Sequence, residues 1–184
     1  MESAQVVALI GFIMLAAVVA LAARRTGSVL QRTRVAEGFR GDIADLAQRV
    51  ERSLGDVSVL IDALRRRSTQ ADVVRPSLDA ARDAVERYAE EARNLGGPKA
   101  TAVHRQAMVG ELERAGRALE LVDHGCLLAL SGRRHEQAGE AETSIKRGYL
   151  NLVHARESIA EHAAAAMVEA EGASPVRRLG RRTP

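Results

Sequence analysis

The sequence predicts an all-α protein in which a single N-terminal transmembrane helix is followed by an antiparallel four-helix bundle. Three observations predict this fold. An uncharged apolar run of about 20 residues opens the chain. Apolar residues then recur at spacings of three and four, which is the helical period. Aromatic residues make up only 2% of the chain, so the core must be filled by aliphatic side chains and Ala, which suit packing between helices.

Residues 4–23, AQVVALIGFIMLAAVVALAA, contain one polar side chain, that of Gln5. A helix of this length spans a bilayer core of roughly 30 Å, at about 1.5 Å per residue. A cleaved signal peptide would have a basic start and a shorter apolar stretch. The chain instead begins with residues 1–3, which include Glu2 and no base. We therefore predict a retained anchor, preceded by a short outside segment.

The charges that flank this run predict its orientation. Arg24, Arg25, Arg32 and Arg34 follow the run, and no Lys or Arg precedes it. Because basic flanks stay on the cytoplasmic side, the N-terminus is predicted to face outward and the rest of the chain to lie in the cytoplasm. The same four arginines are candidate contacts for anionic lipid headgroups.

The stretch 24–41 is predicted to be a basic junction, interrupted by Gly27, Gly38 and Gly41. Its apolar side chains could lie at the membrane surface while its arginines meet the headgroups. The alternative is an ordinary stop-transfer flank that continues into the next helix. The apolar residues concerned are Val29, Leu30, Val35 and Phe39.

Four helical segments are predicted within 42–171, each with one line of core-facing residues, here called a seam. Leu54 and Ile61 lie one position beyond the first seam and widen it. The seams, in chain order, are Ile43, Leu46, Val50, Ser53, Val57, Leu60 and Leu64; Val74, Leu78, Ala81, Val85, Tyr88, Ala92 and Leu95; Met108, Leu112, Ala115, Leu119, Val122 and Cys126; and Ile145, Tyr149, Leu152, Arg156, Ile159 and Ala163.

The segment boundaries follow from turn residues. The second segment is predicted to open near Pro76 and to end at 96–98, which reads Gly-Gly-Pro. Residues 131–132 are the predicted turn before the fourth segment, which runs from about Glu136 to Glu171. Short connections make neighbouring helices antiparallel. A pair of extended hairpins that closes only on dimerisation is the alternative to a closed bundle.

Arg156 is the one charged residue on a predicted seam, between Leu152 and Ile159. A buried guanidinium needs an acidic partner, because its desolvation costs several kcal/mol. Folding the third segment against the fourth brings Arg156 level with Glu111, so these two residues are a candidate buried pair that sets the register. The alternative is that Arg156 extends to the surface along its aliphatic stem.

No catalytic, cofactor or metal site is predicted. Di-metal helical bundles use Glu three residues before His, and none of the five histidines has this spacing. Cys126 lies on a seam, where a small buried cysteine is ordinary. Phosphate-binding loops, dinucleotide motifs and nucleophile motifs are absent from the sequence.

The net charge of +3 is unevenly distributed. Residues 73–172 are slightly acidic, whereas the tail 172–184 contains four Arg and no acidic residue. This tail is predicted to be disordered, and it lacks aromatics for stacking on bases, so no specific nucleic-acid binding is predicted. Its arginines are further candidate contacts with anionic lipid, the alternative being a solvated end. They are Arg177, Arg178, Arg181 and Arg182.

The order of a short outside segment, one membrane helix and a helical bundle resembles the layout of the LemA family. That family carries an Arg-x-Asp-Leu-Ile-Pro-Asn type of motif early in its bundle, whereas residues 42–54 of this chain read DIADLAQRVERSL. The resemblance therefore covers the layout alone, and no functional residue is carried over.

The sequence has strong apolar seams for helix packing and no catalytic, cofactor or metal motif. This combination indicates a non-enzymatic, membrane-anchored scaffold or adaptor that binds a protein partner or another copy of itself. A signalling module driven by a membrane partner is the second hypothesis. A metal-dependent bundle enzyme ranks last. Arg exceeds Lys strongly, with lysine only at Lys99 and Lys146, which indicates a GC-rich bacterial genome rather than selection for phosphate binding.

Overall fold

The computed structural model describes the backbone of residues 2–131 and 134–173, and the side chains of 31, 33–131 and 137–172. Every regular element in these residues is helical. The elements are α1 (Glu2–Arg65), α2 (Ala71–Asn94), the short 3-10 helix η1 (Lys99–Thr101), α3 (Ala102–Leu130) and α4 (Arg134–Ala173).

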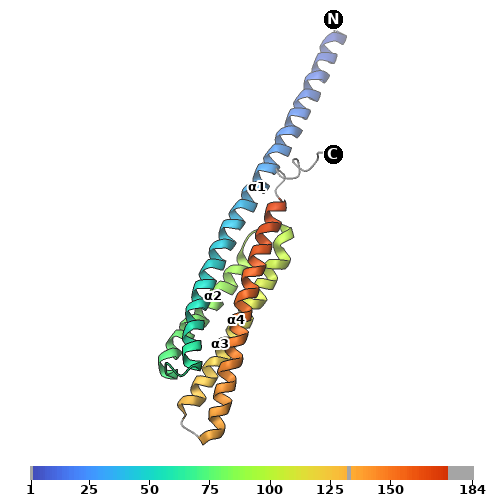
Figure 1. The fold of residues 1–184 in the computed structure, drawn as a ribbon. Helices are drawn as coiled ribbons and strands as arrows, with labels where there is room; N and C mark the ends of the chain where they lie inside the picture. Colours follow the sequence, from blue (N-terminus) through green and yellow to red (C-terminus); the bar gives the residue numbers. More distant parts are fainter. Residues whose placement is uncertain (1, 132–133, 174–184) are drawn as a thin grey trace, which may run out of the picture.

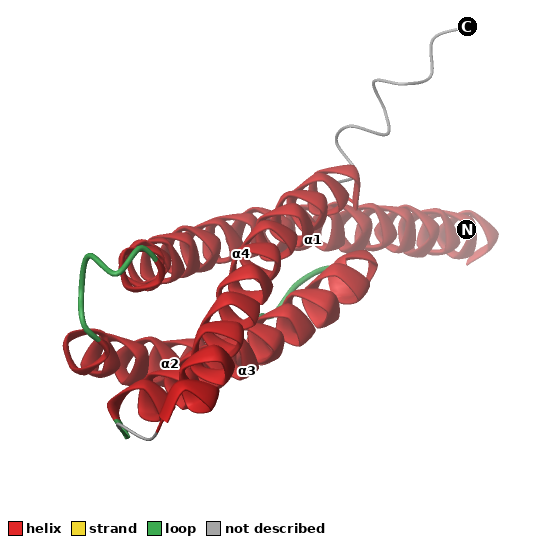
Figure 2. Cartoon of the chain, turned by 60° about the horizontal axis from the view of Figure 1, so that its bottom comes forward, coloured by secondary structure: helices red, strands yellow, loops and turns green. Residues whose placement is uncertain are grey.

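The four α-helices form a closed bundle (Figures 1 and 2). Helix α1 packs against α2 and α4, and α3 packs against the same two helices, so each helix has two principal neighbours. The contact between α3 and α4 is the most extensive, and that between α1 and α2 is the smallest of the four. The predicted all-α, four-helix architecture is confirmed.

Helix α1 is 64 residues long and projects well beyond the bundle at its N-terminal end (Figure 1). It continues through Gly27, Gly38 and Gly41, so the predicted interruption of the junction is wrong. Glycine weakens a helix by only about 0.5–1 kcal/mol relative to Ala, and burial of Ala36 and Phe39 in the bundle offsets that cost.

Phe39 lies in the core with 1% of its surface exposed, rather than at a membrane surface. Its ring packs directly against Gly97, where any Cβ would collide with it. Val35, one turn earlier, is 47% exposed. The side chains of Val29 and Leu30 lie outside the described residues.

Among the described residues, no helix is long and apolar enough to cross a membrane. The predicted anchor, 4–23, belongs to the part of α1 whose side chains are not described.

Helix α2 begins at Ala71 rather than near Pro76, which lies inside it. The missing N–H of Pro76 removes only the bond to the carbonyl of Asp72, early in the helix. Ala71 and Val74 are both buried, and their packing holds the first turn in place. The helix ends at Asn94, before the predicted Gly-Gly-Pro turn.

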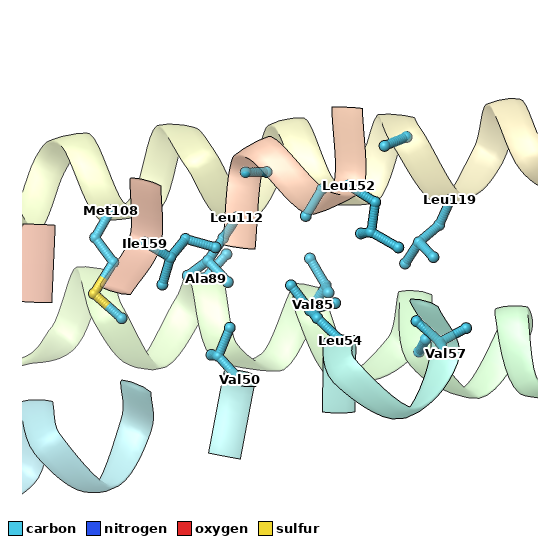
Figure 3. Packing of buried hydrophobic residues seen from close by; sticks show 14 of the residues in the cluster. Val50, Leu54, Val57, Val85, Ala89, Met108, Leu112, Leu119, Leu152 and Ile159 are labelled. Atoms are coloured by element: carbon cyan, nitrogen blue, oxygen red, sulfur yellow. The ribbon is translucent and has the colours of Figure 1, made fainter. Parts of the chain in front are cut away.

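Most predicted seam residues are buried in one continuous core, part of which is seen in Figure 3. Two seams are displaced by one position along part of their length. In α1, Leu54 and Ile61 are fully buried in place of Ser53 and Leu60, which are only partly buried, as is Leu64. The other predicted residues of that seam are buried, namely Ile43, Leu46, Val50 and Val57.

In α4, Gly148 and Ala155 take the core positions predicted for Tyr149 and Arg156, which lie at the edge of the core. The other predicted residues of that seam are buried, namely Ile145, Leu152, Ile159 and Ala163. The reason is that α3 and α4 approach very closely. A Cβ placed on Gly148 would lie 2.7 Å from the Ala118 carbonyl oxygen and 2.5 Å from a Val122 methyl carbon. Only a residue without a side chain fits there.

Gly125 plays the same part on α3. A Cβ on this residue would lie 2.7 Å from Ile145 Cγ1 and 2.9 Å from the Ala141 carbonyl oxygen. On each helix, a glycine thus packs directly against the backbone of the other helix. This close contact explains why α3 and α4 form the most extensive pair of the bundle.

Candidate functional site

The bundle has two different ends, which we call proximal and distal. At the proximal end, α1 projects outward and α4 finishes beside it (Figure 1). At the distal end, the turn between α1 and α2 (66–70) lies beside the hairpin of α3 and α4, which extends further (Figures 1 and 2). Helix α4 therefore returns toward the end from which α1 projects, as antiparallel packing predicts.

Most of the predicted lipid contacts lie outside the described side chains. Arg34 is exposed on α1. The side chains of Arg24, Arg25 and Arg32 are not described, although their backbone is part of α1. The tail residues Arg177, Arg178, Arg181 and Arg182 lie outside the described residues altogether.

The two residues of the predicted register pair are each engaged elsewhere. Arg156 Nε lies 3.5 Å from Glu51 Oε2 of α1, and its guanidinium also lies over Gly55. Its side chain is 27% exposed, as expected for an arginine that extends toward the surface from the edge of the core. The ion pair therefore links α4 to α1.

Glu111 lies 3.1 Å from Arg114 on its own helix, measured from Oε2 to Nη1. This ion pair does not have the geometry of a hydrogen bond, because the buried Glu111 Oε2 accepts no hydrogen bond from the described residues. Glu111 is therefore a half-satisfied carboxylate at the edge of the core.

Histidine and cysteine do not assemble a metal centre in the described part of the chain, where no group of three or more His, Cys, Asp or Glu side chains converges. His104 and His162 face one another at the proximal end with ring centroids 6.0 Å apart, and His104 Nε2 lies 3.5 Å from Glu169. Cys126 is fully buried, and burial raises its pKa to about 11, which disfavours the reactive thiolate.

The distal end contains a pocket of about 550 Å³, which lies between the α1–α2 turn and the α3–α4 hairpin. We call it the distal pocket. Its volume is within the range of ligand sites. Seven apolar residues line it, and we call this set its floor: Leu64, Ala71, Ala129, Leu130, Ala138, Ala141 and Ile145. The pocket exists because α3 and α4 extend past the turn that joins α1 to α2 and leave apolar surface uncovered there.

Basic side chains surround the floor. Arg65, Arg67 and Lys146 line the pocket with a single acid, Glu142. The Arg65 guanidinium stacks over the Tyr149 ring at 4.5 Å and contacts Asp62 at 3.1 Å. The three basic side chains are exposed, and we call them the mouth of the pocket; among the described residues that line it, positive charge prevails.

The α1–α2 turn holds one of these bases in an unusual backbone conformation. Arg67 has φ 58°, in the left-handed region that normally selects glycine. The Arg67 N–H donates to the Leu64 carbonyl, and the Ser68 N–H donates to the Ala63 carbonyl, which is the hydrogen-bond pattern of a Schellman cap. An arginine in this position costs about 1 kcal/mol relative to glycine.

The distal pocket was not predicted from the sequence. The available signal was the pair Leu127 and Leu130, which are apolar but off the seam, and both are nearly half exposed. What the sequence could not supply was the difference in reach between the two helical hairpins.

Comparison with protein-family models, with curated proteins and with solved structures finds no match to this chain. The likeness to the LemA family therefore stays one of layout. The function must be argued from the geometry and the sequence of this chain alone.

Proposed function

We propose that the chain is a membrane-anchored helical scaffold or adaptor, which holds its bundle in the cytoplasm and binds a protein partner there. The observation that supports the proposal is the continuity of α1. This single helix connects the apolar segment 4–23 to the bundle core, which begins at Ala36 and Phe39. A rigid connection of this kind holds a bundle at a set distance and orientation from a membrane.

Arginine asymmetry supports the orientation, because Arg24, Arg25, Arg32 and Arg34 follow segment 4–23 and no base precedes it. The proposed role needs no chemistry from the bundle itself. Its working parts are the anchor, the bundle and a binding surface.

The continuity of α1 also favours a second candidate, a signalling module. A partner that shifts segment 4–23 within the membrane would move α1 against α2 and α4, the two helices that it contacts. Crosslinking in native membranes followed by mass spectrometry separates the candidates. A scaffold is crosslinked to partners through the bundle alone, and a relay is also crosslinked to a membrane protein through 4–23.

The proposed topology predicts which of two introduced thiols reacts from outside the cell. In a Cys126→Ser background, Ser3→Cys should react with an impermeant maleimide on intact cells, and Ser174→Cys should react only after the membrane is permeabilised. The reverse pattern would place the bundle outside. Recovery of the chain in the soluble fraction would refute the anchor itself.

A further inference from the structure

The distal pocket combines an apolar floor with a basic mouth, at the end of the bundle farthest from the projecting part of α1 (Figure 1). We propose that it binds an acidic amphipathic segment of a protein partner. Apolar side chains of that segment occupy the floor around Leu130 and Ile145, and its carboxylates pair with Arg67 and Lys146. This inference rests on the proposed scaffold function and identifies its partner-binding site.

The rim charges are available to a partner. Lys146 is exposed, and no ion pair of this residue is seen among the described residues. Arg67 Nη2 lies 3.8 Å from Glu142, and both side chains are more than three-quarters exposed, so this pair is weak and readily exchanged. Arg67 also occupies a backbone conformation in which glycine would be more stable. A positive charge thus stands at the mouth in a backbone conformation that has an energetic cost for arginine.

The apolar surface is larger than the pocket alone. Leu127 lies one turn before Leu130 on α3, and these side chains are 45% and 49% exposed. A strip of this kind beside a pocket suits successive side chains of an amphipathic helix, which recur every three or four residues. A small anionic ligand would fill the pocket and leave the strip exposed.

Charge also argues against a second copy of this chain as the occupant through the same face. Two distal ends would bring Arg65, Arg67 and Lys146 of one copy against the same residues of the other. Like charges placed opposite one another oppose association. A partner segment rich in Glu or Asp has the complementary charge.

The test uses the full-length chain in nanodiscs of zwitterionic lipid, with empty discs as the blank. Three fluorescent amphipathic peptides share the same stripe of leucines. All their remaining positions are Glu in the first peptide, Gln in the second and Lys in the third. Binding is measured by anisotropy at low and at physiological salt. We expect the Glu peptide to bind and to weaken with salt, and the Gln peptide to bind at least about tenfold more weakly. The Lys peptide should not bind.

Matched variants locate the site. Lys146→Glu should weaken binding of the Glu peptide by about fivefold or more. Lys99→Glu makes the same charge reversal at the chain's other lysine, which lies at the proximal end, and should leave binding unchanged. Leu130→Asp should weaken binding at least about tenfold, and Val168→Asp should not. Both substituted apolar residues are exposed, at 49% and 68%, so the fold is retained in each variant.

Several results would overturn the inference. Equal binding of the three peptides, or equal effects of Lys146→Glu and Lys99→Glu, would show that the distal pocket does not select acidic segments. Saturation of the pocket by a medium-chain carboxylate without binding of the Glu peptide would identify a small anion as the occupant. Self-association abolished by Leu130→Asp would identify a second copy.

Failure of this inference is distinguishable from failure of the proposed function. A chain that is integral to the membrane but does not bind the Glu peptide remains an anchored scaffold with another binding face. A chain recovered as soluble protein that still binds the Glu peptide through Lys146 and Leu130 refutes the anchor and leaves the site intact.

Discussion

Single residues without side chains determine how closely the helices of this bundle pack. At Gly148 and Gly125 the backbones of α3 and α4 come within van der Waals contact, and at Gly97 the ring of Phe39 occupies the space of a Cβ. Gly38, Gly41, Gly110 and Gly139, by contrast, have nothing within 4 Å of a Cβ. Glycines in the same bundle therefore have opposite consequences on substitution.

Gly148→Ala should destabilise the chain by roughly 1–3 kcal/mol, because the new methyl group meets the Ala118 carbonyl and forces α3 away from α4. Gly139→Ala, on the same helix, should instead stabilise it by about 0.5–1 kcal/mol through helix propensity. Urea unfolding followed by circular dichroism measures both. Stabilisation by Gly148→Ala would mean that the two helices lie farther apart than described.

Cys126 should be unreactive in the folded chain. Burial raises its pKa from the ordinary 9.0 to about 11, so at pH 8 the folded thiol is neutral as well as covered. Modification by an aromatic disulfide reagent should be slow in buffer and fast in denaturant. Because the folded pKa is the higher one, this residue's contribution to stability is complete below about pH 9 and is lost as the pH rises through about 11. Equal rates in the two states would contradict its burial.

Among the elements, α1 differs from the other three helices because it belongs to the bundle along only part of its length. Its proximal part projects, and its distal part supplies core residues from Ala36 to Ile61. Its contact with α2 is partly polar, with Arg49 donating to Glu91 at 3.0 Å and Ser53 and Tyr88 hydroxyls 2.9 Å apart. The hydrogen bond to Glu91 raises the pKa of Arg49.

Gly41→Pro tests whether α1 is continuous at the entrance to the core. Proline removes the hydrogen bond to the Glu37 carbonyl and collides with it, so the chain should lose about 3 kcal/mol or more of stability. Gly41→Ala, for which there is open space, should add about 0.5–1 kcal/mol. Urea unfolding again provides the measurement. If the junction were an interrupted linker, both substitutions would change stability by less than about 0.5 kcal/mol.

At the scale of the whole molecule, the antiparallel arrangement brings the end of α4 to the side of the bundle from which α1 projects. Helix α4 finishes at the proximal end, beside α1 (Figure 1). The sequence that follows Ala173 contains Arg177, Arg178, Arg181 and Arg182, and the sequence before Gln31 contains Arg24 and Arg25. We propose that both basic stretches meet the same anionic headgroups.

Removal of residues 173–184 should weaken binding to anionic vesicles. Each arginine near such a surface contributes up to about 1 kcal/mol, within a Debye length of about 8–10 Å. Vesicle sedimentation of a chain lacking 1–23 measures the effect, and binding should fall steeply with added salt. Replacement of the four tail arginines by Gln should reproduce the truncation. Unchanged binding in both variants would assign the tail no role at the membrane.

The local pattern of the sequence was sufficient to predict the helices, most of the core residues and the antiparallel order of the helices. The apolar period depends only on neighbours three and four residues apart, and short connections leave little choice of direction. The same pattern cannot distinguish two adjacent seams. Ser53 or Leu54 in α1, and Gly148 or Tyr149 in α4, satisfy the same spacing.

Only the tertiary structure decided between those seams and created the distal pocket. Close packing of α3 on α4 requires a residue without a side chain, so Gly148 faces the core and Tyr149 and Arg156 move to its edge. Arg156 thereby meets Glu51 of α1, a residue more than one hundred positions earlier in the chain. The pocket results from the unequal reach of the two helical hairpins at one end of the bundle. Such features depend on distances between helices, and these are set by the packing of residues remote in sequence.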